Sequence, residues 1–157
     1  MKTLWAIALS LLLPLPMDAG KDRHCMLRLH MEANVHDTVA FATSVHAQFS
    51  GKDVAIERVA RISEQDITAF YPYHAADGSY GALLKLDEHG RITLEGLSLE
   101  RRGSLLFVFV NGRPLTEVEI DKRISDGQIY IASGLTEADI ALMKKDWRLI
   151  GQKKKKR

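Results

Sequence analysis

The sequence predicts an α+β protein in which short strands form a mixed or antiparallel sheet with two helices on one face. Runs of alternating apolar and polar residues, such as CMLRLHMEA at 25–33, have the period of half-buried strands. Asn111-Gly112 lies between two such runs and favours a tight hairpin turn. Thr136 followed three residues later by Asp139 predicts the start of a helix. With 157 residues, 46% of them hydrophobic and 27% charged, the composition suits one globular domain.

Residues 1–19 have the pattern of a secretory signal peptide, with a positive residue near the start and a small residue before the expected cleavage site. The alternative is an uncleaved membrane anchor. The apolar run at 3–16 has about fourteen residues, fewer than the roughly 20 that span a bilayer, and Pro14 and Pro16 interrupt it. We therefore expect a periplasmic or secreted protein with a single domain at 20–150.

The charges are unevenly distributed along the chain. The domain is slightly acidic, whereas the chain ends in a basic run, Lys153, Lys154, Lys155, Lys156 and Arg157. Mutual repulsion predicts a disordered tail at 151–157. An alternative role for this tail is weak attraction to an anionic membrane surface or envelope polymer. Nucleic acid is not expected as a partner, because the body of the protein is acidic.

Three strands are expected in the first part of the domain. The alternating run at 25–33 places Cys25 on its apolar face, and because Cys25 is the sole cysteine no intramolecular disulfide is possible. We expect Cys25 to be a small buried residue. The run at 39–49 also alternates, and a turn separates it from a third short strand at 54–59.

The middle of the chain mixes helical and extended signals. Ser63 and Asp66 form a capping box for a short helical turn, and an extended segment follows at 67–73. Pro72 lacks a backbone N–H, so this strand should lie at a sheet edge or end there.

The next two elements are a strand at 80–86 and a helix at 91–102. Asp87 to Gly90 are interpreted as the turn that ends the strand, and Gly103 as the residue that ends the helix. Gly96 inside the helix lowers its intrinsic stability.

The last part of the chain carries the clearest pattern. The unbroken apolar run at 105–110 predicts a strand covered on both faces. After the Asn-Gly turn, 115–120 is the return strand with one wet face. A further strand is expected at 128–132, followed by the capped helix, which ends near Trp147.

The order of these elements over residues 81–143 resembles the head subdomain in the first periplasmic region of the protein-export membrane protein SecD. The segments that carry the resemblance are YGALLKLDEHG, LLFVFVNGRPLTEVEID, ISDGQIYIASGLT and EADIALM. The resemblance implies a ferredoxin-like α+β unit that contacts polypeptide outside the membrane without catalysis. SecD has several membrane spans, and nothing after Leu13 here has the length and composition of one. We therefore expect an accessory module of protein export rather than a transporter.

No residue pattern predicts catalysis or a cofactor. The aspartates lie beside glycines or at strand ends, where aspartate stabilises turns. The sequence has no nucleophile elbow and no phosphate-binding glycine loop. The alternative is a small secreted enzyme with a histidine-based metal site, for which His30 and His46 on neighbouring strands are the candidate ligands. Solvent-facing strand histidines are the simpler interpretation, so no metal site is predicted.

Aromatic residues supply the candidate binding site. Tyr71, Tyr73 and Tyr80 surround Pro72, where an edge strand would offer unpaired backbone groups to an extended peptide. Arg113 adds a cation for an anionic contact. The sequence therefore predicts a non-catalytic module that binds a polypeptide or an envelope protein through these four side chains.

Overall fold

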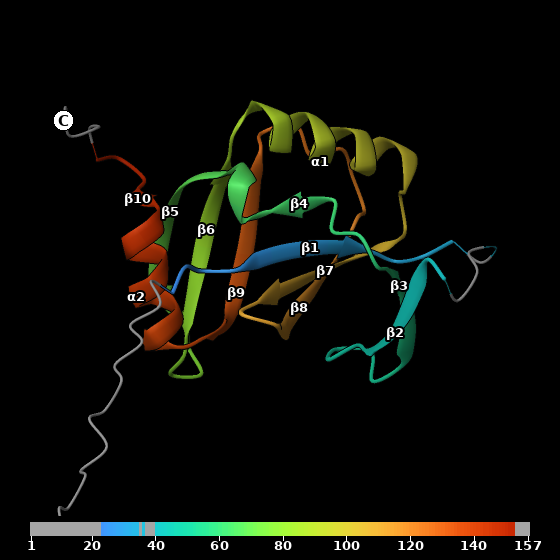
Figure 1. The fold of residues 1–157 in the computed structure, drawn as a ribbon, viewed down its shortest axis with the longest axis horizontal. Coiled ribbons are helices and arrows are strands. Elements are labelled where there is room, and N and C mark those ends of the chain that lie inside the picture. The colour runs from blue at the N-terminus through green and yellow to red at the C-terminus, as the bar shows by residue number, and fades with distance from the viewer. Residues whose placement is uncertain (1–22, 35, 37–39, 153–157) are drawn as a thin grey trace, which may run out of the picture.

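The computed structural model describes residues 23–34, 36 and 40–152. It contains two four-stranded sheets and a separate hairpin (Figure 1). The first sheet has the strand order β4 (Ile62–Ser63), β1 (Leu27–Met31), β7 (Leu105–Val110) and β8 (Arg113–Glu119). The second has the order β10 (Arg148–Leu149), β5 (Ile67–His74), β6 (Tyr80–Leu86) and β9 (Gln128–Leu135). The hairpin consists of β2 (Ala42–His46) and β3 (Asp53–Glu57).

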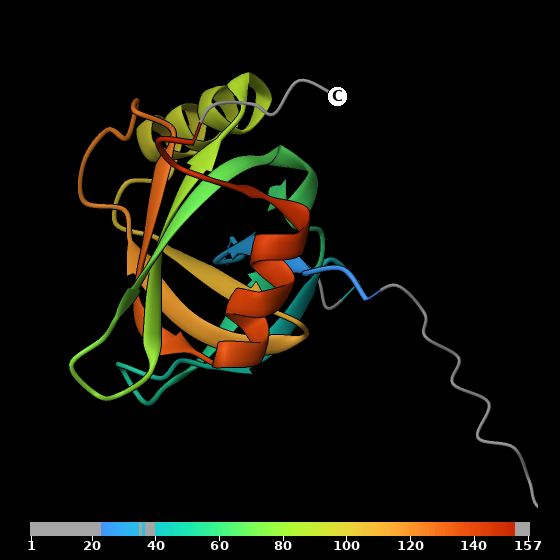
Figure 2. The same ribbon diagram turned by 90° about the vertical axis from the view of Figure 1, so that its left-hand side faces the viewer.

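The helices are α1 (Glu88–Glu100) and α2 (Glu137–Asp146), with a short 3-10 turn, η1 (Glu64–Asp66), before β5. Figures 1 and 2 show α1 across one end of the strands and α2 beside β5 and β10. The α+β class is confirmed. The strands form two sheets, because α1 carries the chain away from β6 of the second sheet and the next strand, β7, pairs with β1 in the first. The two helices lie on different sides of the molecule (Figures 1 and 2).

The first sheet places β7 at its centre, antiparallel to β1 and to β8. Leu106, Val108 and Val110 point into the main core, whereas Phe107 packs with Ala47 and Ile56 in a second cluster under the hairpin. The prediction that this strand is covered on both faces is confirmed, and the hairpin provides the second cover.

In the second sheet, β6 pairs antiparallel with β5 on one side and with β9 on the other. Pro72 lies opposite Ala82 of β6. On its other side β5 pairs with β10 only at Ala69 and Phe70. Pro72 therefore lies where β5 is an edge strand, as its missing N–H requires.

One main core joins both sheets and both helices. Phe70 of β5 is fully buried and meets the ring of Trp147 edge-on, with 6.2 Å between centroids. Leu94 of α1 and Met143 of α2 reach the same core from different sides. Cys25 is buried there as expected. Burial of this apolar surface from four directions is the main stabilising contribution.

Several element boundaries differ from the prediction by a few residues, and two of these differences have a clear structural cause. The helix expected from Arg91 begins at Glu88, because the Asp87 carboxylate accepts a hydrogen bond from the Gly90 N–H at 2.8 Å and so caps the helix. The strand expected at 39–49 is shorter, since residues after His46 form the turn at the hairpin tip. This turn is closed by hydrogen bonds between Ala47 and both Lys52 and Gly51.

Two further expectations lie outside the described residues: the signal peptide at 1–19 and the basic run that ends the tail. Within the described part of the chain, neither helix has the length and apolar character needed to cross a membrane.

Candidate binding groove between the two sheets

A groove of about 520 Å³ lies between β8 and β9. Each of these strands is the last in its sheet, so each has one edge that is not paired to a neighbouring strand. An unpaired edge exposes backbone N–H and C=O groups. The groove therefore combines an apolar hollow with two rows of available hydrogen-bonding groups.

Two features fix the length of the groove. At one end β8 and β9 converge, where a side chain on Gly134 would place its Cβ only 3.0 Å from Cδ1 of Leu115. Gly134 also has a positive φ of 93°, which favours glycine. At the other end, the 120–127 connection lines the groove through Lys122 and Ile124.

The floor of the groove is apolar. Leu94, Leu106 and Ile129 line it, and each also belongs to the buried core. Two aromatic side chains stand at the rim: Phe49 is 76% exposed and Tyr130 is 60% exposed. An apolar ligand could bury both rings without unfolding any element.

The hairpin tip is held at the groove by one carboxylate. Glu117 of β8 accepts hydrogen bonds from the backbone N–H of Phe49 at 2.6 Å and of Gln48 at 3.2 Å. The Gln48 side chain also donates to the Pro114 carbonyl at 3.1 Å. These contacts place Phe49 beside β8, although the two are far apart in sequence.

Tyr130 is held from the opposite side of the groove. Its ring stacks on that of Tyr73, with 5.5 Å between centroids and 10° between planes. The Tyr73 hydroxyl donates to the carbonyl oxygens of Ile131 at 2.5 Å and Ala132 at 3.1 Å. Burial and the neighbouring Tyr130 raise the pKa of Tyr73, so its hydroxyl remains a proton donor.

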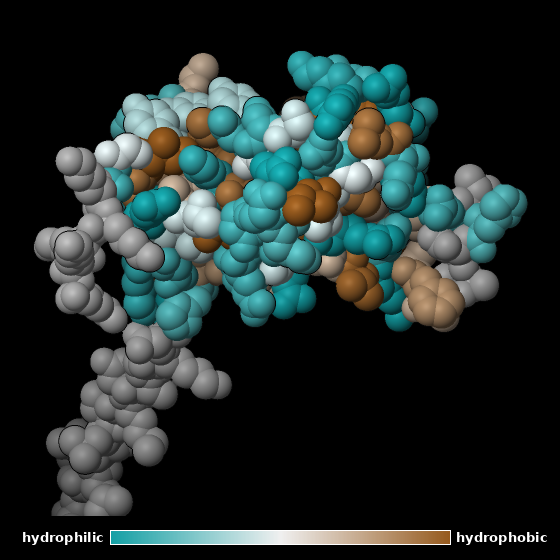
Figure 3. Space-filling view, turned by 90° about the horizontal axis from the view of Figure 1, so that it is seen from above, coloured by the Kyte–Doolittle hydropathy of each residue, from teal (hydrophilic) through white to brown (hydrophobic). Residues whose placement is uncertain are grey.

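The outer face of the second sheet continues this aromatic surface. Tyr71 lies opposite Leu83, and Leu83 lies opposite Tyr130, so the three side chains form a row across β5, β6 and β9. Tyr71 is exposed and Leu83 is half-buried. On the α1 side of the molecule, in contrast, hydrophobic residues appear as separate spots among hydrophilic ones (Figure 3).

The four residues predicted to bind a partner have different environments. Tyr71 is exposed, and Tyr73 is half-buried with its hydroxyl bound to β9. Tyr80 packs against the core and the ring of His74, 4.6 Å away. Arg113 donates to the Asp139 carboxylate at 2.6 Å, which ties the β7–β8 hairpin to α2. Tyr71 and Tyr73 are thus brought together with Tyr130, whereas Tyr80 and Arg113 lie elsewhere.

The histidines of the alternative metal site are not brought together. His30 Nδ1 lies 2.8 Å from the Glu57 carbonyl, and its ring packs edge-on against Phe109. His46 lies on the hairpin and bonds Asp53 at 3.0 Å. Both partners belong to β3, but Glu57 and Asp53 lie at opposite ends of the hairpin, so each ring is held in a separate place.

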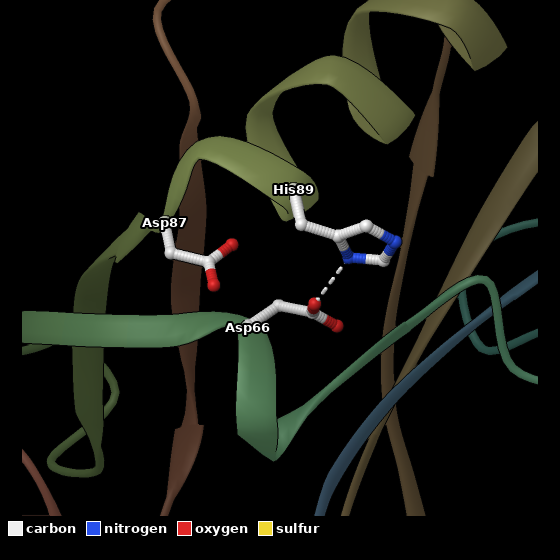
Figure 4. Close-up of side chains that lie close together, drawn as sticks. All are labelled: Asp66, Asp87 and His89. Carbon is white, nitrogen blue, oxygen red and sulfur yellow. Dashed lines mark hydrogen bonds and ion pairs between the residues drawn. The ribbon is translucent and has the colours of Figure 1, made fainter.

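Among the described residues, one other group has the ligand types and spacing for a metal ion: Asp66, Asp87 and His89, whose ligand atoms lie within 4.8 Å of one another (Figure 4). Protein donors already occupy it. Asp66 accepts from the His89 ring at 2.7 Å and from the Ser63 N–H at 2.8 Å, while Asp87 caps α1. The positive end of the α1 dipole is also unfavourable for a cation. The side chains of this cluster therefore connect η1 to the start of α1.

Sequence reasoning missed Phe49 and Tyr130. Tyr130 had a signal, since Ile129 and Ile131 alternate with it and leave its ring on the outer face of β9. Phe49 had none, because its place beside β8 depends on a contact with Glu117 across the fold. The groove itself follows from which strands end the two sheets, and this cannot be read from periodicity.

Comparison with models of protein families found no match, and comparison with curated proteins found none either. Solved structures of similar fold were found, among them the following two. One is of SecDF, a membrane component that enhances protein export; it matches with a TM-score of 0.55 and 17% identity over 92% of this chain and 78% of that chain. The other is SecDF in a super-membrane-facing form, with a TM-score of 0.54 and 17% identity over 80% of this chain and 19% of that chain.

The chain therefore has a SecD-like fold. The similarity extends well beyond residues 81–143, on which the sequence resemblance depended, because it covers 92% of the chain. This extent agrees with the strand pairing, since β1 pairs with β7 and β5 pairs with β6.

Proposed function

We propose that this SecD-like domain is a non-catalytic polypeptide-binding module that acts outside the membrane as an accessory of protein export. The observation that carries the proposal is the apolar groove between the unpaired edges of β8 and β9. An extended polypeptide is the ligand whose backbone and side chains both match such a site.

An extended segment can add to a strand edge by main-chain hydrogen bonds, while alternate side chains enter the pockets beside it. In this groove, every second side chain of the ligand would face the floor formed by Leu106 and Ile129. Phe49 and Tyr130 would cover the ligand from the two rims. Main-chain recognition is tolerant of sequence, which suits a protein that meets many unfolded chains.

The four residues predicted to bind a partner contribute to the proposed site in different ways. Tyr71 extends the apolar surface beyond the groove, and Tyr73 orients Tyr130 through ring stacking. Tyr80 packs against the core, and Arg113 forms an ion pair with Asp139 of α2, so both stabilise the structure around the site.

The location outside the membrane rests on two observations: the signal-like composition of residues 1–19, and a fold like that of SecDF, which enhances protein export. The basic run Lys153 to Arg157 adds a second, weaker contact, with anionic lipid, at about 1 kcal/mol per basic residue near the surface. Deleting these five residues should remove salt-sensitive binding to vesicles that contain anionic lipid and leave polypeptide binding unchanged.

The test compares two phenylalanines on the same hairpin. Binding of a labelled, reduced and carboxymethylated protein to the full chain is measured by fluorescence anisotropy, with the same protein in its folded form alongside. We expect the unfolded form to bind preferentially, and Phe49→Ala to weaken binding about fivefold or more. Phe41 is similarly exposed, at 70%, but lies outside the groove, so Phe41→Ala should have no effect.

Equal binding of the folded and unfolded proteins would contradict the proposal. Equal losses from Phe49→Ala and Phe41→Ala would show that any exposed ring on the hairpin suffices and that the groove is not the site.

A further inference from the structure

We infer that the groove selects extended segments in which apolar residues alternate with basic ones. This inference rests on the proposed function and adds the class of polypeptide that the groove takes. It follows from the charges at the rim and from the stereochemistry of an added strand.

The rim of the groove carries an excess of negative charge. The side chains of Glu117, Glu119 and Asp126 line it, against the single ammonium of Lys122. Arg123 lies in the same connection, but its guanidinium is bound to the carboxylate of Glu95, so its charge is already compensated.

The three carboxylates differ in how far the protein already uses them. Glu117 accepts the two amides of the hairpin tip, and one oxygen of Asp126 accepts the Gln128 N–H at 3.1 Å. Glu119 is exposed, and within the described part of the chain no donor contacts its carboxylate. Glu119 is therefore the acid most available to a cation on a ligand.

An added strand would bring its polar positions to this rim. Successive side chains of a strand point to opposite faces and repeat on one face about every 6.6 Å. If the apolar residues face the floor at Leu106 and Ile129, the intervening residues point outward past Glu119 and Asp126. Lysine or arginine at these positions meets opposite charge, whereas glutamate or aspartate meets like charge.

The alternative is a groove that binds any apolar segment equally, whatever the charge of its outward residues. Area burial alone does not distinguish ligands that differ only at outward positions. A charge preference at the outward positions of the ligand would show that these side chains point toward the rim of the groove. It would also show which residue type the rim favours there.

The experiment uses three labelled peptides that share the same alternating valines and carry lysine, serine or glutamate at the intervening positions. Binding to the full chain is measured at low and at high salt. We expect the lysine peptide to bind about fivefold more tightly than the glutamate peptide at low salt, with serine between them. High salt should shrink the difference, because the rim charges are exposed to solvent.

Two matched variants locate the effect. Glu119→Gln should reduce the lysine preference, whereas Glu137→Gln, which removes an exposed acid in the first turn of α2, should leave it intact. Phe49→Ala should weaken the lysine, serine and glutamate peptides by the same factor, which identifies the groove as the common site.

The outcomes distinguish failure of the proposed polypeptide binding from failure of the charge selection alone. If none of the peptides bind, the proposed function itself fails. If all three bind equally and all lose affinity in Phe49→Ala, the groove binds polypeptide without charge selection, and this inference is overturned while the proposed function stands. A lysine preference that persists in Glu119→Gln would also overturn the assignment to this rim.

Discussion

The hydroxyl of Tyr73 lies 2.5 Å from the carbonyl oxygen of Ile131, so a side chain of β5 reaches across β6 to bind β9. The contact passes over Gly81, where β6 has no side chain in the way. It holds the Tyr130 ring against Tyr73 at the rim of the groove.

Tyr73→Phe removes this hydrogen bond and leaves the stacked rings. We expect the free energy of unfolding in urea to fall by about 1 kcal/mol, the usual net contribution of one such bond. Tyr71→Phe is the control, because Tyr71 lies on the same strand and face and its side chain is exposed. Equal effects of the two changes would mean that the Tyr73 contact contributes nothing specific.

Gly81→Ala should be strongly destabilising. A Cβ at this position would lie 2.2 Å from Cζ of Tyr73 and 2.5 Å from the carbonyl oxygen of Ala132, and the second of these is backbone. We expect a loss of about 2–4 kcal/mol in urea unfolding. Gly96→Ala in α1 is the opposite case, because its Cβ would meet nothing within 4 Å. That change should raise stability by up to about 1 kcal/mol.

Substitution of the buried Asp139 should lower the stability of the protein strongly. Burial acts to raise its pKa, but bonds from Thr136 and Asn111 and the charge of Arg113 outweigh burial and leave the pKa lowered. Asp139→Ala removes the half of the α2 capping box that accepts the Thr136 N–H, and it leaves Arg113 and Asn111 without their acceptor. We therefore expect a loss of about 3 kcal/mol at neutral pH. Arg113→Ala should cost less, because its guanidinium is half exposed.

The sign of the pH dependence follows from the lowered pKa. The contribution of Asp139 is present above its ordinary value of 3.8 and is lost as the pH falls through the folded-state pKa. Urea unfolding of the wild type and Asp139→Asn at neutral and acidic pH measures this. A difference that stays constant down to the most acid point would refute the linkage.

His89 should give the reverse dependence. Its hydrogen bond to Asp66, together with the charge of that carboxylate, raises the pKa of His89 above 6.5. Stabilisation by the protonated ring is therefore complete below 6.5 and disappears as the pH rises through the folded-state pKa. We expect His89→Gln to be less stable than the wild type at about pH 5, with the two converging at about pH 9. His36→Gln, which changes an exposed histidine that does not contact Asp66, is measured alongside as the control.

Cys25 should be inert in the folded protein. Burial raises the pKa of its thiol to about 12, and the carboxylates of Asp139 and Asp146 act in the same direction. Thiolate is the reactive form, so iodoacetamide at about pH 8 should label the protein only after denaturation. Rapid labelling under native conditions would show that the segment before β1 opens readily.

Local features of the fold were predictable because their causes are local. The capping boxes of Ser63 and Thr136 are both present, and Asn111 and Gly112 adopt the positive φ values of 51° and 79° that the hairpin turn requires. The strand at 80–86 was predicted with its observed bounds. In each of these elements, residues within a few positions of one another determine the structure.

The arrangement in space was less predictable. Periodicity assigned β6 and β7 to strands, but it carries no information on which strand pairs with which. Pairing of β1 with β7 is what separates the two sheets and leaves β8 and β9 as their edges. Phe49 reaches the groove only through Glu117 of β8. The site depends on these distant contacts, so it emerges from the structure and not from any motif.

The strand order also has a consequence for when the protein can fold. β1 pairs with β4 and β7, and the β7 pairing joins Leu27 to Val110 across about half of the chain. Closing so long a loop is entropically costly, and folds dominated by such contacts form slowly. As the chain appears from its N-terminus, β1 must wait for the 105–119 hairpin before its sheet can form. The first half is therefore the part most dependent on being kept from aggregating until synthesis and any transport are complete.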